Sequence, residues 1–551
     1  MGTFLSPARR TPVRYTLVLA AVALFAPSGL FAADPPITFQ TQPFDRVLGD
    51  LRTAADFVGG EKAIKAFNAS LKEKLGAKGF EGLDINQPIV GYVILAPKPE
   101  DITAVVVLPI TGEKEFLALC DRANSVKHKD LGKGLYELPP LDSRYKARMR
   151  FSDGHAYIAY GAKPEPALEP KALVPAGKLF DPAETAAFTG KLHFDRITPE
   201  VKVALLTVLM DAKKELLGQI DDNPDAAAFK PIFADLEKLA KRYLLLLGDA
   251  DTATLRVSLD PATGDVVTEA TLTPKPKTEL AKQIAAREPA KNRFAGLITP
   301  DTVAGGYYSM PLFAEEIRVG YAALTEAQAK EMVQNLPAAA KDTVEELFKG
   351  QSRTMKSGEL DMAAALRGPD KNGHFSAVVA MSFDNPAALE KAFKKFMEAD
   401  ATLSVFGEFK WNADKAGTVD IHTFKLGQAV PAEVRGLFGD ECSLAFAFAP
   451  KGIYLTLGPD PVATLKDAMK AKPVVAPALD VVINPAKIAK LVEKGGGDPL
   501  AIERALGREN KLLSAMSIRV TSGKELSLRF AVNLKLFPRA AASDSFGPDK
   551  D

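Results

Sequence analysis

Residues 88–110 read PIVGYVILAPKPEDITAVVVLPI, and residues 358–383 read GELDMAAALRGPDKNGHFSAVVAMSF. Each stretch contains two apolar runs that are separated by a short segment with proline, a pattern that predicts a β-hairpin. We expect the turns around residues 97–99 and around residues 369–370. Two hairpins of the same form, placed about half a chain apart, suggest an internal repeat.

A helical pattern follows each of these hairpins, over residues 112–123 and over residues 385–399. Thr111 and Asp384 precede them, and both residue types are favoured as helix N-caps because their side-chain oxygen accepts a backbone N–H. When the two stretches are aligned without gaps, Thr111 falls on Asp384. The helices therefore follow the hairpins in the same order in both halves.

The rest of each half repeats the same succession. A hairpin pattern comes next, then a short apolar strand that meets a proline at the start of a helix, with Thr198 and Asn484 as expected N-caps. A last hairpin ends each half. The matching pairs are residues 147–161 with 442–458, 192–202 with 479–489, and 254–272 with 517–536.

The fold class follows from this order. We predict an α+β protein made of two tandem copies of one unit, each a mainly antiparallel sheet with amphipathic helices packed on one face. The first α+β repeat unit is expected over residues 34–288 and the second over residues 289–541, with a disordered tail at 542–551. Val106 and Val379 should then lie on equivalent strands.

Residues 1–33 have the features of a signal peptide. A basic segment precedes an apolar run from Tyr15 to Phe25, and the small residues Ala32 and Ala33 precede Asp34. This order predicts cleavage after Ala32 or Ala33 and export to the periplasm or the outside of the cell. A membrane anchor is the alternative, but Pro27 and Gly29 would interrupt its helix.

Charge and composition exclude several classes of function. The 551 residues are 47% apolar and 25% charged, as in ordinary soluble proteins. Basic residues number 70 and acidic residues 69, so the chain lacks the positive field that nucleic acid requires. We therefore predict no nucleic-acid partner, and no membrane span once the signal is removed.

The residues that usually carry catalysis or bind metals are sparse. The five histidines are far apart in sequence, and the adjacent carboxylates at 315–316 and 345–346 do not face one another on a helix. Cys120 and Cys442 fall in segments that do not correspond, which favours two free thiols. The sequence predicts no catalytic residue, no metal site and no cofactor.

Two hypotheses for function remain. The first is an exported cell-envelope protein that binds or scaffolds an apolar ligand or an envelope protein without catalysis, in a pocket lined mainly by apolar residues. The stripe Ile232, Leu236, Leu239 and Tyr243 is the candidate for one helical wall of that pocket, although packing in the core against a sheet face is the favoured interpretation of such a stripe. The alternative is a hydrolase whose site lies between the two units and is built from residues distant in sequence.

Overall fold

The structure is a computed structural model. It describes residues 34–139, 145–221, 248–287, 289, 291–309, 315–334, 336–399, 407–426 and 430–536. The expected signal peptide, the stripe from Ile232 to Tyr243 and the expected tail lie outside these residues. Helices and antiparallel strands alternate along the described chain, so the mixed α and β composition is as predicted.

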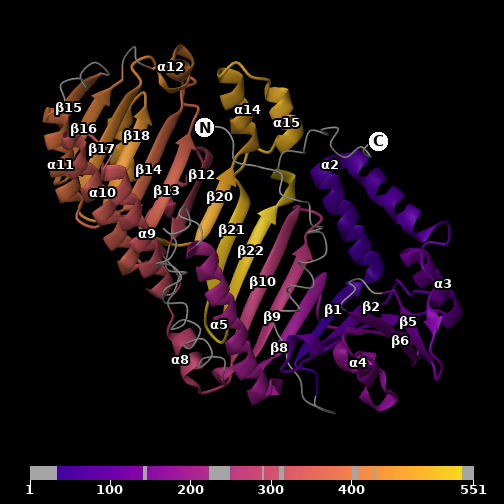
Figure 1. The fold of residues 1–551 in the computed structure, drawn as a ribbon. Coiled ribbons are helices and arrows are strands. Elements are labelled where there is room, and N and C mark those ends of the chain that lie inside the picture. Colours follow the sequence, from indigo (N-terminus) through magenta and orange to yellow (C-terminus); the bar gives the residue numbers. More distant parts are fainter. Residues whose placement is uncertain are drawn as a thin grey trace.

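One long sheet runs through the molecule, and the first half of the chain forms ten of its strands (Figure 1). Neighbours along the sheet follow the order β4-β5-β6-β7-β3-β2-β1-β8-β9-β10, and every pair is antiparallel. The strands are β1 (Ile37–Pro43), β2 (Pro88–Ile94), β3 (Thr103–Pro109), β4 (Lys129–Asp130), β5 (Leu135–Leu138), β6 (Lys146–Ser152), β7 (His155–Gly161), β8 (Phe188–His193), β9 (Ala250–Leu259) and β10 (Asp265–Pro274).

The second half continues the sheet with the same succession of short and long connections. Its order is β15-β16-β17-β18-β14-β13-β12-β20-β21-β22, again antiparallel throughout. These strands are β12 (Thr302–Ser309), β13 (Asp361–Arg367), β14 (Ser376–Ser382), β15 (Glu408–Ala416), β16 (Val419–Lys425), β17 (Ser443–Ala449), β18 (Gly452–Gly458), β20 (Leu479–Ile483), β21 (Leu513–Thr521) and β22 (Leu526–Asn533).

The two halves meet where β10 pairs with β22, a ladder that we call the seam. At its centre Thr268 lies opposite Phe530, and the pairing continues on both sides. Away from the seam the registers also match: Val106 is opposite Gly91 in the first half, and Val379 is opposite Ala364 in the second. Strands that are far apart in sequence thus occupy corresponding places on either side of the seam.

Helices connect the strands, and they lie both near the two ends of the sheet and across its middle (Figure 1). The chain forms α2 (Phe44–Leu75), α3 (Glu113–Asn124), α4 (Ala176–Leu179), α5 (Pro199–Asp221), α8 (Glu279–Ala286), α9 (Glu315–Gln334), α10 (Ala338–Ser357), α11 (Pro386–Ala399), α12 (Ala432–Phe438), α13 (Pro461–Ala468), α14 (Pro485–Lys494) and α15 (Pro499–Leu506). In both halves a helix follows the hairpin that the sequence predicted, α3 after β2 and β3, and α11 after β13 and β14.

The prediction that helices cover one face of the sheet is wrong, because both faces are covered. Met149 and Ile158 pack under α2 and α3 on one face, whereas Val105 and Tyr157 pack against α4 and the turns before it on the other. The reason lies in β2, β3 and β7, which are apolar over successive residues rather than at alternate ones. A strand of that kind needs apolar neighbours on both sides.

Two of the predicted N-caps are displaced by one residue. Helix α3 begins after Gly112 rather than after Thr111, and α11 begins after Asn385 rather than after Asp384. Asn385 Oδ1 accepts the N–H of Ala388 at 3.4 Å, and the proline at position 386 takes the first helical position that proline prefers. At α11 the N-cap is therefore Asn385 and not Asp384, the residue that aligns with Thr111.

The other two cap predictions have different outcomes. Asn484 caps α14 as predicted, because its Oδ1 accepts the N–H of Lys487 at 3.1 Å. Thr198 precedes α5 as predicted, but its hydroxyl has no hydrogen-bond partner, so its side chain is not the cap. The helix begins there because the carbonyl of Thr198 accepts the N–H groups of Val201 and Lys202.

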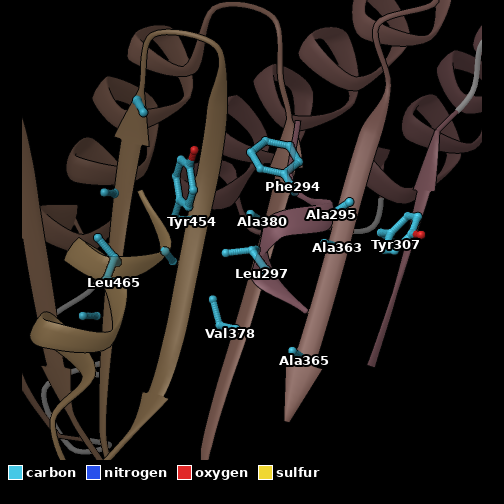
Figure 2. Close-up of a cluster of buried hydrophobic side chains, with 14 of the residues drawn as sticks. Phe294, Ala295, Leu297, Tyr307, Ala363, Ala365, Val378, Ala380, Tyr454 and Leu465 are labelled. Carbon is cyan, nitrogen blue, oxygen red and sulfur yellow. The ribbon is translucent and has the colours of Figure 1, made fainter. Parts of the chain in front are cut away.

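The largest apolar cluster belongs to the second half. A segment at residues 291–297, formed by β11 (Lys291–Asn292) and a short 3-10 turn η6 (Ala295–Leu297), lies over β13 and β14. Figure 2 shows Phe294 and Leu297 beside Val378 and Ala380, which both belong to β14. The Phe294 ring meets Tyr454 edge to face at 5.6 Å. We call residues 291–297 the plug.

Hydrogen bonds from a buried asparagine hold the plug in place. Asn292 donates to the carbonyl of Tyr308 at 2.9 Å and to the Ser309 hydroxyl at 3.0 Å, and its Oδ1 accepts the N–H of Phe294 at 2.8 Å. The Asp361 carboxylate accepts the N–H of Arg293 at 3.0 Å and a hydrogen bond from Ser309. Hydrogen bonds therefore attach the plug to β12 and β13, and its apolar side chains fill the space over the sheet.

Candidate functional site

A cleft of about 370 Å³ opens between β1, β8 and the turn around α4 in the first half. Its floor is formed by side chains that β1 and β8 direct to the same face, because Thr38 pairs with Lys191 and Gln40 pairs with Thr189. Volumes of this order are typical of small-molecule sites. The remaining lining residues are Asp34, Pro35, Phe39, Val174, Lys178, Leu179, Phe180, Asp181, His193 and Arg196.

The polar wall of the cleft is held by a network around Asp181. Gln40, which is buried, donates to the carbonyl of Asp181 at 3.0 Å and accepts its N–H at 2.7 Å. Lys191 Nζ lies 3.1 Å from Asp181 Oδ2. The pKa of the Asp181 carboxyl is below its usual value, chiefly because Lys191 donates this hydrogen bond to the charged form. Asp181 and Lys191 are therefore fixed relative to the floor.

Two further groups close the end of the cleft where β8 stops. Arg196 donates to the carbonyl of Pro35 at 3.1 Å and lies 3.7 Å from the Asp34 carboxylate. The pKa of His193 is lowered by its burial and then by the nearby charge of Arg196. The imidazole is therefore held in its neutral form at pH 7, in which one ring nitrogen can donate and the other can accept a hydrogen bond.

The floor also holds a hydroxyl without a partner. Thr189 is only 2% exposed, and its Oγ1 makes no hydrogen bond in the protein. Buried polar groups are nearly always paired, so an unpaired hydroxyl in a cleft wall is unusual. Phe180, 39% exposed, and the buried Leu179 provide apolar surface nearby. The cleft thus combines apolar walls with unused hydrogen-bonding capacity.

The corresponding place in the second half is closed. By register, the pairs Thr38–Lys191 and Gln40–Thr189 correspond to Gly305–Val482 and Tyr307–Asp480. The Tyr307 hydroxyl donates to Asp480 at 3.4 Å, so both groups are satisfied. Ile298, directly after the plug, lies against Gly305, where a Cβ would come within 3.0 Å of its side chain. Matched strands carry an open cleft in one half and a filled core in the other.

The seam between the halves shows a different surface. Leu255, Leu528 and Phe530 are 37 to 44% exposed on one face of the sheet. They lie together because Leu255 and Leu528 both flank Ala270, and Phe530 is opposite the next residue on that face. Large exposed apolar side chains in a group are uncommon on soluble proteins. We call these three residues the apolar strip.

The opposite face of the seam is charged. Glu269 lies between Arg256 on one neighbouring strand and Arg529 on the other. Arg256 is also paired with Glu184 at 2.9 Å. Cross-strand pairs of opposite charge stabilise a sheet by roughly 0.2–1 kcal/mol each. The other carboxylate on this face of β10 in the seam is Asp265, opposite Asn533. Four residues of strand separate it from Glu269, about 13 Å, which is farther apart than the two carboxylates of a glycoside hydrolase.

The residues weighed from the sequence are scattered. Glu345 and Glu346 both pair with Lys349 on the surface of α10. His422 is fully buried among aromatic rings, with its Nδ1 accepting the N–H of Asn412 at 3.1 Å. Only His193, of the histidines, lines the cleft. Cys120 and Cys442 are both free, as the sequence favoured.

Sequence reasoning missed the cleft and misjudged its lining. The prediction of a mainly apolar pocket is wrong for this cleft, where charged and polar side chains outnumber apolar ones. The sequence alignment of residues 192–202 with 479–489 places Lys191 on Ala478, whereas the strand register places it on Val482, so the replaced core position has no signal in the sequence. The other partners come from residues 174–181, whose return to the sheet no periodicity indicates.

Neither metal binding nor a membrane span is indicated in the part of the chain that the structure describes. No group of three or more His, Cys, Asp or Glu side chains is placed to hold a metal ion there. Among the same residues, no helix is long and apolar enough to cross a bilayer.

Comparisons with known proteins do not assign the chain to a family. No protein-family model matches it, and neither a curated protein nor a solved structure is similar to it at a significant level.

Proposed function

We propose that the protein is a non-catalytic binding protein and that the cleft between β1, β8 and α4 takes a small organic molecule. The observation that carries this proposal is the cleft itself: a cavity of about 370 Å³ with an unpaired buried hydroxyl, a neutral histidine and fixed charged groups. Sites of this size, with a few converging polar groups, are the usual form of small-molecule sites.

We infer further that the two halves are tandem copies of one unit, with boundaries near residues 34–288 and 289–541. The matched strand orders and registers support this inference. A duplicated unit can retain its core in one copy while the other copy diverges. The closed second half and the open first half fit such a history, and they favour binding over a catalytic site shared between the units.

The test of binding is native mass spectrometry on the full-length chain, purified after export. We expect a bound small molecule that is released, unchanged, on denaturation. Thr38→Trp places an indole where Ile298 covers Gly305 in the second half, so this variant should lose the bound mass. Thr521→Trp, at an exposed strand end, is the matched control. A wild-type chain that never carries extra mass, even with a ligand library present, would contradict the proposal.

Export is part of the same proposal. The basic segment, the apolar run and the small residues before Asp34 support a cleaved signal, and a periplasmic or extracellular location follows from it. Intact mass of the exported chain should give an N-terminus at Ala33 or Asp34. An exported chain that retains Arg9 would instead indicate an anchor.

A second candidate function is association with an envelope protein through the apolar strip. The exposure of Leu255, Leu528 and Phe530 favours it, because water-exposed side chains of this size are stabilised by burial against a partner. Phe530→Glu should shift the chain to smaller complexes in size-exclusion chromatography of an envelope extract. Identical elution of the variant and of the wild-type chain would remove this candidate.

A hydrolase site at the seam is the alternative, and the residues there do not favour it. The test is incubation of the purified chain with simple ester and glycoside substrates. Turnover that is lost in Glu269→Gln, with unchanged unfolding, would favour the hydrolase over the binding protein.

A further inference from the structure

We propose that the ligand of the cleft is a small organic anion whose charged group is held by Lys191 and the cations next to it. This inference rests on the proposed function, and it adds the chemical class of the ligand. It starts from the charges of the lining: three cations, Lys178, Lys191 and Arg196, face two carboxylates, Asp34 and Asp181. The cleft therefore carries a net positive charge.

The carboxylates do not neutralise the cations equally. Asp181 is engaged by Lys191 at 3.1 Å, whereas Asp34 is 3.7 Å from Arg196 and is largely exposed. Lys178 projects from α4 and is exposed. Arg196 uses one nitrogen for the Pro35 carbonyl and keeps other donors of its planar group for a ligand. An anion entering the cleft would meet several N–H donors on fixed elements.

A comparison with the matched positions of the second half supports a role in binding for the cations of the cleft. Lys191 corresponds to Val482, which is 6% exposed, and His193 corresponds to Asn484, which caps a helix. A lysine is rarely placed on the packed face of a sheet unless its charge has a use there. The first half has thus replaced a core position by a cation and leaves the nearby Thr189 hydroxyl unpaired.

The apolar walls of the cleft indicate the chemistry of the uncharged part of the ligand. Leu179 and Phe180 lie on one side of the cleft, and Val174 adds to that side. An aromatic or short alkyl group would pack there while its anionic group reaches Lys191. The volume of about 370 Å³ suits a compact organic acid rather than a polymer.

The experiment compares two probes of equal shape, 4-phenylbutanoate and 4-phenylbutan-1-ol, with the full-length chain. Binding is followed by the NMR resonance of the His193 ring, assigned with His193→Gln. We expect the carboxylate to bind at least about tenfold more tightly than the alcohol, because hydrogen bonds to a charged group are stronger than those to a neutral hydroxyl.

Two variants, one without a cation and one without a carboxylate, test whether charge causes the preference for the carboxylate probe. Lys191→Met should remove most of the preference for the carboxylate, and Asp181→Asn should increase it. Lys282→Met, on the exposed surface of α8, should leave it unchanged. Equal affinity for both probes, or a preference that Lys191→Met does not reduce, overturns the anion class but leaves cleft binding intact. If neither probe moves the His193 resonance at millimolar concentration, cleft binding by such molecules fails as well.

Discussion

In the two halves of the sheet, different segments of the chain cover the same face of matched strands. On the face that carries the cleft, the first half uses the buried side chains of Tyr92 and Val105, and the turn around α4 covers them. By register the second half has Ala365 and Val378 at these places, and the plug fills the space with Phe294 and Leu297. Tyr157 and Tyr454 occupy matched positions in both.

The reach of the covering segment decides whether these matched strands carry an open cleft or a filled core. In the second half Ile298, directly after the plug, reaches Gly305 and closes the floor between β12 and β20. In the first half the α4 turn covers β2, β3 and β7 and also contacts β1, partly through the hydrogen bonds between Asp181 and Gln40, but it leaves the cleft open beside β1 and β8. The strands at this cleft carry Thr38, Thr189 and Lys191.

Removal of the plug's main side chain should have the largest effect. We expect Phe294→Ala to lower the free energy of unfolding by about 3–5 kcal/mol, because a fully buried ring leaves a cavity. Urea unfolding followed by circular dichroism measures it. Val475→Ala, an exposed change in β19 (Val474–Val475) beside the plug, should change it by less than about 0.5 kcal/mol. Similar losses in both variants would mean that the plug is not part of the core.

Removal of the plug's polar anchor should cost less. Asn292→Ala leaves the Tyr308 carbonyl, the Ser309 hydroxyl and the N–H of Phe294 without their buried partner. A loss of about 1–3 kcal/mol is expected, since unsatisfied buried groups are costly. Asn372→Ala, in an exposed turn, is the control. If Asn292→Ala unfolds like wild type in urea, the plug is held by apolar contacts alone.

A smaller effect is expected at the cleft, where His193 should make the free energy of unfolding depend on pH. The pKa of His193 is lowered by burial and by Arg196 and Lys191, while Asp195 and Asp251 act in the opposite direction. Because its folded pKa is below the unfolded value, the stability it contributes is present above about pH 6.5 and is lost as the pH falls through the folded pKa.

Arg196→Gln should raise the His193 pKa in an NMR titration and reduce this acid-side loss of stability. Lys282→Met should leave the titration of His193 unchanged, since α8 lies outside the cleft lining. A His193 pKa that is the same in wild type and Arg196→Gln would contradict the described position of the guanidinium.

The smallest effect concerns the cysteines, one in each half. Burial raises the pKa of Cys120 to about 11, and Cys442 is 1% exposed, so neither is a ready thiolate. Alkylation with iodoacetamide at pH 8 should be slow in the folded chain and should modify both residues in urea. Recovery of an unmodified pair under urea without reductant would reveal a disulfide.

The sequence predicted the helices and strands better than it predicted the cleft and the covered faces of the sheet. Hairpins at residues 147–161 and 442–458 were predictable because apolar alternation and turn residues act locally. The predicted caps at Thr111 and Asp384 are each one residue early: Asn385 supplies the side-chain acceptor at α11, whereas α3 begins after Gly112 with no side-chain cap. The expectation of helices on one face of the sheet is wrong because β2 and β3 carry apolar side chains at successive residues, so both of their faces need apolar neighbours.

The amino-acid sequence by itself determined the kinds of element and their order in each half, since these depend on local patterns. Only the tertiary structure decided that the plug fills one half and that Lys191, Asp181 and Arg196 converge in the other. The physical reason is that convergence depends on which strands pair and how far a covering segment reaches. Neither property is encoded in the periodicity of a single stretch of chain.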